Sequence, residues 1–130
     1  MNHILKKYCP RIEFDSYEDF YENFKIDVPE AFNFGFDVVD EWARVEPEKR
    51  ALVWCDDHDH ERTFTFTDLS RLSNQAANAF RKLGIGKGDV VMMILRRRWE
   101  YWVCAVALCK LGATIIPASL QLTKKDIAYR

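Results

Sequence analysis

A continuous apolar run, followed by a helix that is apolar nearly all round, constrains the fold of this chain more than any other feature. The run extends from Val90 to Leu95 and is typical of a strand that is covered on both faces. The next segment, 99–111, carries apolar residues on almost every side, which predicts a deeply buried helix. Gly112 ends this helix, and residues 113–116 predict a second covered strand. The order strand, helix, strand indicates an α/β unit with parallel pairing.

Two helices are predicted in the first third of the chain. Asp15 or Ser16 can cap a short one, because such side chains accept hydrogen bonds from the free backbone N–H groups of a first turn. A second helix is expected from about Phe34 to Val45, and Pro47 bars its continuation. Its predicted apolar stripe consists of Phe34, Val38, Trp42 and Val45.

A hairpin and a long helix are predicted next. The segments 51–55 and 62–66 read as two strands, since apolar residues alternate in the second segment and a polar loop joins the two. Thr67 is the expected cap of the long helix, and Gly84 stands where that helix should end. The apolar positions of the helix recur every three or four residues: Leu69, Leu72, Ala76, Phe80 and Leu83.

Together these elements predict an α/β fold, in which a partly parallel sheet is flanked by helices. Residues 1–31 are interpreted as an N-terminal helical leader, and residues 32–130 as the body. Thr123, with Asp126 three residues later, resembles a capping box that opens one more helix near the end of the chain.

Composition and charge exclude several classes of protein. Of the 130 residues, 48% are hydrophobic and 30% are charged, which is typical of a globular protein rather than a disordered one. The net charge of -1 gives no general attraction to nucleic acid or to an anionic membrane. The longest apolar stretch, 103–111, is too short to cross a bilayer, so no membrane span is expected.

The cysteines and the first residues bear on location. Four cysteines, at positions 9, 55, 104 and 109, lack C-x-x-C spacing and lie mostly in apolar runs. This pattern favours buried free thiols in a reducing cytoplasm. Residues 1–7 contain no apolar core long enough for a signal peptide. The prediction is therefore a cytoplasmic protein.

Charge is distributed unevenly along the chain. Residues 13–48 contain twelve acidic and two basic residues, whereas residues 62–130 contain four acidic and twelve basic residues. Two solvated faces that partly neutralise each other would explain the asymmetry. A basic half that faces a phosphate-bearing ligand, such as a nucleotide or CoA, would also explain it.

Three local motifs use residue types that bind metals or phosphates. Residues 56–60 read Asp-Asp-His-Asp-His, but zinc sites rarely depend on one flexible loop, so a solvated hairpin loop without a metal is expected. The glycines at 84, 86 and 88 follow a helix, whereas phosphate-binding glycine loops follow a strand, so they indicate a turn. The triplet Arg96–Arg98 follows a parallel strand, where open α/β folds bind ligands. A phosphate contact and a solvated rim both fit this triplet.

Several segments together resemble the opening of the adenylate-forming enzymes. The segment 32–43 resembles the first helix of medium-chain acyl-CoA synthetases and related acetyl-CoA synthetase-like enzymes. Residues 63–69 match the family's T-(F/Y)-x-E-L junction between a strand and a helix, with Asp in place of Glu. Residues 108–117 resemble the element L-x-K-x-G-A-x-x-x-P. The stretches 73–78 and 83–91 fit the family between these two elements.

The resemblance implies the N-terminal part of the large domain of an ATP-dependent, AMP-forming carboxylate–CoA ligase. Such enzymes join a carboxylate to Mg-ATP as an acyl-adenylate and then transfer the acyl group to the thiol of CoA. ATP, Mg²⁺ and CoA are thus implied for the full-length enzyme. The family's glycine-rich phosphate loop, ribose-binding aspartate and C-terminal lysine have no counterpart in these 130 residues. The chain alone is therefore expected to be inactive, with no catalytic residue and no bound cofactor.

The resemblance also implies one binding residue. The loop Ser119–Gln121 is similar to a loop that lines the CoA passage in medium-chain acyl-CoA synthetases, which makes Gln121 the candidate CoA contact. The alternative is a polar residue that merely precedes a helix cap. Arg96 departs from the family pattern, because relatives commonly carry proline at this position.

Two other functions stay open at this point. One is a non-catalytic binding or interaction module derived from the same subdomain, and the other is a ligase that uses a carrier-protein thiol. The last strand and the helix over 99–111 carry more apolar surface than a short fragment can bury. The isolated chain is therefore expected to self-associate, whereas the full-length protein should bind a small carboxylate, ATP and CoA.

Overall fold

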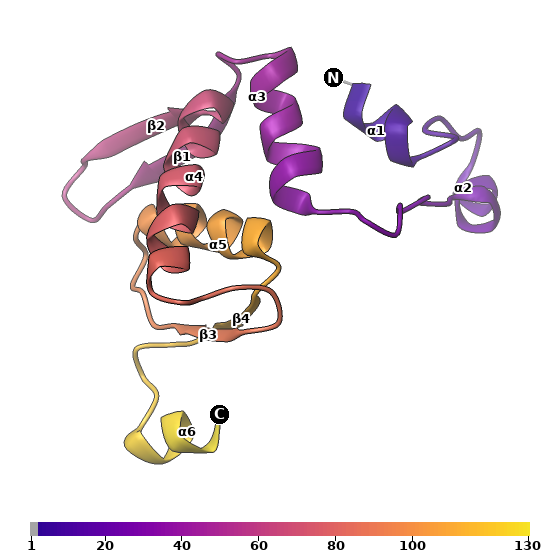
Figure 1. Cartoon of the computed structure of the whole chain (residues 1–130). Helices are drawn as coiled ribbons and strands as arrows, with labels where there is room; N and C mark the ends of the chain where they lie inside the picture. The colour runs from indigo at the N-terminus through magenta and orange to yellow at the C-terminus, as the bar shows by residue number, and fades with distance from the viewer. Residues whose placement is uncertain (1–2) are drawn as a thin grey trace. The chain divides into compact units, whose positions relative to one another are not determined.

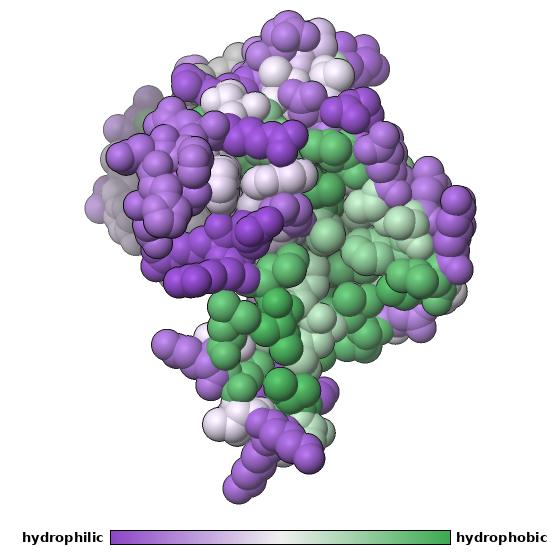
Figure 2. Space-filling view, turned by 90° about the vertical axis from the view of Figure 1, so that its left-hand side faces the viewer, coloured by the Kyte–Doolittle hydropathy of each residue, from purple (hydrophilic) through white to green (hydrophobic). Residues whose placement is uncertain are grey.

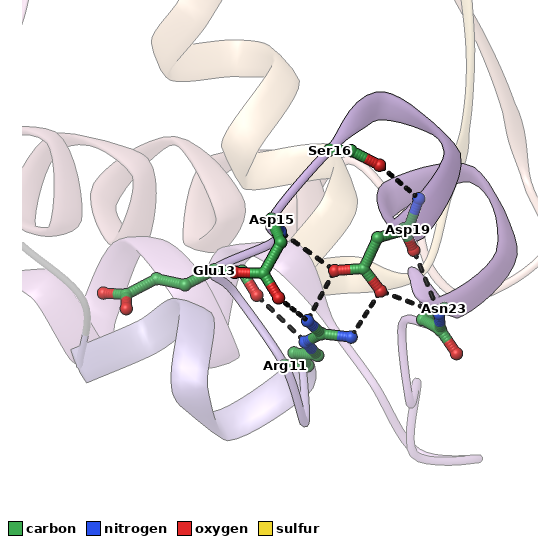
Figure 3. A network of polar contacts seen from close by, with 6 residues as sticks. All are labelled: Arg11, Glu13, Asp15, Ser16, Asp19 and Asn23. Atoms are coloured by element: carbon green, nitrogen blue, oxygen red, sulfur yellow. Dashed lines mark hydrogen bonds and ion pairs between the residues drawn. The ribbon is translucent and has the colours of Figure 1, made fainter.

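A polar network around Arg11 organises the first of two units into which the chain divides, Met1–Phe32. The structure is a computed structural model that describes residues 3–130. The guanidinium of Arg11 donates to both carboxylate oxygens of Asp19, at 2.6 and 2.5 Å (Figure 3). The backbone N–H of Asp15 donates to the same carboxylate, and with Arg11 it holds the pKa of Asp19 below its ordinary value. This network fixes the turn that leads into the second helix.

The described residues of this unit form two short helices, α1 (His3–Tyr8) and α2 (Tyr17–Asn23). Ser16 caps α2, since its hydroxyl accepts the backbone N–H of Asp19 at 3.2 Å, and this confirms the predicted start of the helix. Helix α1 was not foreseen from the sequence. None of the residues of α2 is buried, so aromatic contacts supplement the polar network: Phe14 packs edge-to-face on Phe20, and Phe20 stacks on Phe24.

The second unit, Asn33–Arg130, contains the remaining elements. They begin with a π-helical segment, η1 (Gly35–Asp40), which continues into α3 (Glu41–Val45). The others are β1 (Arg50–Cys55), β2 (Glu61–Thr65), α4 (Phe66–Lys82), β3 (Val90–Met93), α5 (Glu100–Leu111), β4 (Thr114–Pro117) and α6 (Lys124–Tyr129). The described strands form two separate pairs, β1–β2 antiparallel and β3–β4 parallel (Figure 1). The α/β fold with parallel pairing is confirmed, although the pairs do not join into one sheet.

The hairpin and the start of α4 differ slightly from the sequence prediction. Strand β2 ends at Thr65 rather than at residue 66, and Thr65 rather than Thr67 caps α4. The reason is a capping box: the Thr65 hydroxyl accepts the Asp68 N–H, while the Asp68 carboxylate accepts the Thr65 N–H at 3.1 Å. Phe64 on β2 is only 2% exposed and anchors the hairpin in the core.

The core lies where η1, α4 and α5 meet. Its buried members are Val39, Leu69, Val103 and Val106. Val39 lies outside the stripe predicted for its helix, and the predicted member Phe34 is 49% exposed. The difference arises because a π-helix forms i→i+5 hydrogen bonds, so it does not keep the 3.6-residue spacing on which the stripe was based.

The parallel pair is covered less than the sequence predicts. Strand β3 ends at Met93, which is buried, but Val90 is 60% exposed, and Ile94 and Leu95 beyond the strand are exposed as well. Figure 1 shows α5 along one side of the pair. The expectation that both faces of this strand are covered is therefore wrong for the described residues. Figure 2 shows apolar side chains gathered on one face of the molecule.

Gly112 makes the sharp connection from α5 to β4. Its φ of 70° lies in the left-handed region, which a glycine adopts without steric cost. The N–H groups of Gly112 and Ala113 donate to the carbonyls of Cys109 and Leu108, both at 3.0 Å, so the last turn of the helix is satisfied. The predicted stop of the helix at Gly112 is confirmed.

A buried lysine joins the three helical segments of the core. The side chain of Lys110 on α5 is 2% exposed, and its Nζ donates to Asp40 Oδ1 at 2.7 Å and to Asn74 Oδ1 at 2.8 Å. Asp40 belongs to η1 and Asn74 to α4. An ammonium group in a core needs such partners, because an unpaired buried charge costs several kcal/mol or more.

Gly35 and Asn33 fit η1 closely against α5. A Cβ on Gly35 would overlap the Cγ of Lys110, so only glycine leaves room for the lysine stem. The Asn33 side chain donates from Nδ2 to the Cys109 carbonyl at 2.7 Å and accepts the Gly35 N–H at 2.9 Å. These contacts tie the start of η1 to the end of α5.

We predict that Asp40→Ala lowers the free energy of unfolding by about 3 kcal/mol, because it leaves the Lys110 ammonium buried beside a single neutral partner. Lys110→Met should cost less, since it removes the charge itself and fills a similar volume. Urea denaturation of the 130-residue chain would measure both values. Glu48→Ala, which removes an exposed carboxylate, is the matched control and should change stability by at most about 0.5 kcal/mol. Equal losses for Asp40→Ala and Glu48→Ala would contradict the prediction.

Candidate ligand site at the carboxyl edge of the parallel strands

Two loops of interest leave the sheet at the same edge. Because β3 and β4 are parallel, with Met93 paired to Pro117, their carboxyl ends lie side by side. The triplet Arg96–Arg98 follows β3, and the loop Ser119–Gln121 follows β4. The Ala118 N–H donates to the Met93 carbonyl at 3.0 Å, which keeps the beginnings of the two loops together. Open α/β sheets bind ligands at this edge.

The backbone of the arginine loop is fixed by two hydrogen bonds. The Arg98 N–H donates to the Arg96 carbonyl at 2.5 Å, which forms a tight turn. The indole N–H of Trp54, from the hairpin, donates to the Arg97 carbonyl at 2.8 Å. A residue of β1 therefore determines where the loop after β3 lies.

Arg62 adds a second connection between the hairpin and this edge. Its guanidinium carbon lies 4.3 Å from the ring centre of Trp99 and 4.6 Å from that of Phe64. Such stacking of a planar cation on aromatic rings stabilises the packing of β2 against the start of α5.

Glu100 balances part of this positive charge. Its carboxylate accepts from Arg98 at 3.2 Å. Burial raises its pKa, but its own backbone N–H, Arg98 and the charge of Arg62 outweigh burial and hold the pKa below its ordinary value. Arg98 is therefore committed to an ion pair, whereas the side chains of Arg96 and Arg97 have no ionic or hydrogen-bonding partner among residues 3–130.

The hairpin and the arginine loop border an open hollow of about 810 Å³. It is lined by Trp54, Cys55, Asp56, Asp57, His58, Arg96, Arg97 and Arg98. A smaller hollow of about 300 Å³ adjoins the same arginines and adds Leu95, Tyr101 and Trp102. Volumes of this size lie in the range of small-molecule sites. Sequence reasoning identified the arginines but not Trp54 or the wall contributed by the hairpin.

Gln121 lies on an exposed loop and does not line either hollow. Its N–H donates to the Ser119 hydroxyl at 3.1 Å, which shapes the loop. Two residues later, Thr123 and Asp126 form the predicted capping box and start α6. The structure therefore places Gln121 at the same sheet edge as the arginines, on the neighbouring loop.

The acidic hairpin loop uses its polar side chains to close its own turn. The Asp56 carboxylate accepts the N–H groups of His58 and His60, at 2.8 and 3.0 Å, and lies 2.9 Å from the His60 ring nitrogen. The ring hydrogen bond from His60 is the main cause that holds the pKa of Asp56 below its ordinary value. Across the part of the chain that the structure describes, no group of three or more His, Cys, Asp or Glu residues is arranged to hold a metal ion.

The cysteines occupy different environments. Cys9 is buried, and burial raises the pKa of Cys104 and of Cys109, which are half-buried. Cys55 is exposed at the end of β1, so the expectation of buried thiols is wrong for this residue. From Leu52 onward the strand alternates between half-buried and exposed residues, and Cys55 falls on the exposed side with Val53. From residue 3 to residue 130, no helix is long and apolar enough to cross a membrane.

Comparison with known proteins identifies the family. The family model described as AMP-binding enzyme matches residues 39–130. The mitochondrial acyl-coenzyme A synthetase ACSM3 of Mus musculus is 38% identical over 123 residues, which cover 90% of this chain and 21% of that protein. The mitochondrial acyl-coenzyme A synthetase ACSM4 of Rattus norvegicus is 39% identical over 109 residues, or 79% of this chain and 19% of that protein. The chain thus spans about a fifth of the length of these relatives.

Solved structures agree with this result. A fatty acyl CoA synthetase of Mycobacterium tuberculosis superimposes with a TM-score of 0.67 at 27% identity, over 75% of this chain and 18% of that chain. The N-terminal domain of FACL13 from the same organism gives a TM-score of 0.66 at 27% identity, over 75% and 23% of the two chains. The predicted N-terminal subdomain fold of the acyl-CoA synthetases is confirmed.

One prediction from the sequence is corrected by the same comparison. A cytoplasmic location was expected from the cysteines and the first residues, but the curated relatives named above are mitochondrial proteins. Free thiols do not distinguish the two compartments, so the cysteine pattern does not indicate a cytoplasmic location. This chain belongs to the AMP-binding enzyme family, because the family model matches residues 39–130, the identity with acyl-coenzyme A synthetases extends over most of the chain, and the fold is shared.

Proposed function

We propose that a protein carrying this chain is an ATP-dependent, AMP-forming carboxylate–CoA ligase. The observation that supports this most is 38% identity to an acyl-coenzyme A synthetase across 90% of the chain. The substrates would be an acyl carboxylate, ATP with Mg²⁺, and CoA. Residues 1–31 would form a leader, and residues 32–130 the first part of the family's N-terminal domain. CoA is a better supported acceptor than a carrier-protein thiol, since both relatives named above are acyl-coenzyme A synthetases.

The chain would contribute structure and one edge of a binding surface rather than the reaction centre. Phosphoryl and acyl transfer need positioned charge at the phosphates of the nucleotide. The motifs that would supply this charge in the family have no counterpart in the 130 residues. The groups at the sheet edge, an arginine loop and a glutamine loop, are suited to binding and not to acid–base or nucleophilic catalysis.

We predict that the 130-residue chain releases no pyrophosphate from ATP in the presence of CoA and a panel of carboxylates. A longer protein that carries the same residues should release one pyrophosphate for each acyl-CoA formed. A coupled pyrophosphate assay, with acyl-CoA followed by chromatography, would measure both. Carboxylate-independent ATP hydrolysis by the longer protein would count against the ligase, and turnover by the short chain would show that the chain itself holds the reaction centre.

Gln121 is proposed as a CoA contact on the loop after β4. In the longer protein we expect Gln121→Ala to raise the KM for CoA several-fold and to leave acyl-adenylate formation unchanged. A lost hydrogen bond to a neutral group is worth about 0.5–1.5 kcal/mol, which corresponds to this range. Separate assays of the two half-reactions test it, with Gln75→Ala, an exposed glutamine on α4, as the matched control. Equal losses in both half-reactions would argue against a CoA contact.

Self-association of the isolated chain is proposed from its exposed apolar surface. Val90 on β3, Trp102 on α5 and Leu120 after β4 are 60%, 53% and 58% exposed. Apolar patches and unpaired strand edges favour association. Sedimentation at micromolar concentrations should therefore detect a dimer or larger species, and Trp102→Glu should shift the distribution toward the monomer. A wild-type chain that sediments only as a monomer would disprove this proposal.

A further inference from the structure

We infer that Arg96 and Arg97 form a binding site for the phosphate group of a ligand, in the hollow between the hairpin and the loop after β3. Two guanidinium groups with no partner among the described residues line the same hollow of about 810 Å³. Arginine is suited to this role, because its fixed array of N–H donors matches the oxygens of a phosphate group. The site is distinct from Gln121 and does not depend on the ligase activity proposed above.

The loop is held in place before any ligand arrives. The Trp54 indole holds the Arg97 carbonyl, and the Arg98 N–H holds the Arg96 carbonyl. Arg98 itself is paired with Glu100, so this third arginine supports the loop and leaves its neighbours available. A backbone that is already ordered loses little entropy on binding, which favours affinity.

The acidic residues of the hairpin loop, Asp56 and Asp57, line the same hollow and limit its affinity for an anion. Asp56 is occupied by three hydrogen bonds within its own loop and is directed to the turn. Asp57 lines the hollow and has no partner among the described residues, so its charge opposes an anion. The hollow is therefore lined by two carboxylates, because Asp56 keeps its negative charge while its oxygens accept hydrogen bonds within the turn. Against them stand Arg96 and Arg97, which have no partner among the described residues, so the result is an anion site of moderate strength that removal of Asp57 should improve.

An aromatic surface adjoins the two arginines. The smaller hollow is shared by Arg96, Arg97 and Trp54 and is lined by Leu95, Tyr101 and Trp102, of which Trp102 is 53% exposed. Indole rings stack on flat ring systems at such surfaces. The site therefore fits a phosphate-bearing molecule that also contains a planar ring better than it fits free phosphate. Both ATP and CoA carry this combination, and the experiment has to distinguish them.

Isothermal titration of the 130-residue chain tests the site with five probes: pyrophosphate, AMP, ATP, CoA and adenosine. AMP, ATP or CoA should bind with a Kd that rises with NaCl concentration, because the contact is between charges. Pyrophosphate should bind more weakly than the preferred nucleotide, and adenosine should show no salt-dependent binding. The rank of ATP against CoA identifies the source of the phosphate.

Variants separate this site from general electrostatic attraction. Arg96→Ala and Arg97→Ala should each weaken binding about tenfold, the scale expected for a charge-assisted hydrogen bond. Asp57→Asn should tighten binding. Arg81→Ala removes the same charge from the exposed last turn of α4 and should leave the Kd unchanged. Circular dichroism would verify that each variant is folded. An equal effect of Arg81→Ala, or no effect of Arg96→Ala and Arg97→Ala in folded protein, would overturn the proposal.

Discussion

The packing of the second unit depends on the ammonium group of Lys110. It lies inside the core of three helical segments and is compensated by a carboxylate from η1 and an amide from α4. A hydrophobic core is tolerant of small shifts, but a buried cation is not, because moving either partner away leaves the charge without compensation. This interaction therefore fixes the relative positions of η1, α4 and α5, as a buried polar residue fixes the register in other folds.

The position of Lys110 also affects the sheet and its edge. Helix α5 connects β3 to β4, so its placement aligns the two parallel strands. Their alignment brings the arginine loop and the glutamine loop to one edge. The hairpin contacts the arginine loop through Trp54 and the start of α5 through Arg62. Residues distant in the sequence thus meet at a surface that is suited to binding phosphate, while the buried lysine that orders them lies between the helices.

Much of the fold could be predicted from local patterns. The hairpin, the long helix, the buried helix and the stop at Gly112 follow from alternation, from three- and four-residue spacing and from glycine geometry, which act over a few residues. The predictions from local patterns were wrong where a different local structure formed instead of the expected one. Because of the Thr65–Asp68 capping box, α4 starts earlier than predicted. Because η1 is π-helical, the buried residue is Val39 rather than the predicted Val38.

The candidate site could be predicted only in part. By itself the sequence determined that Arg96, Arg97 and Arg98 follow a parallel strand and that Gln121 follows the next one, because strand order and chemistry are local properties. Only the tertiary structure decided that Arg98 pairs with Glu100 while Arg96 and Arg97 have no partner among residues 3–130, and that Trp54 and Asp57 complete the hollow. The tertiary structure also decided that Val90 is exposed and that Asp40 and Asn74 are the partners of Lys110. Burial and pairing depend on which surfaces meet, and the packing of distant segments determines this, whereas the pattern of a single strand or helix does not.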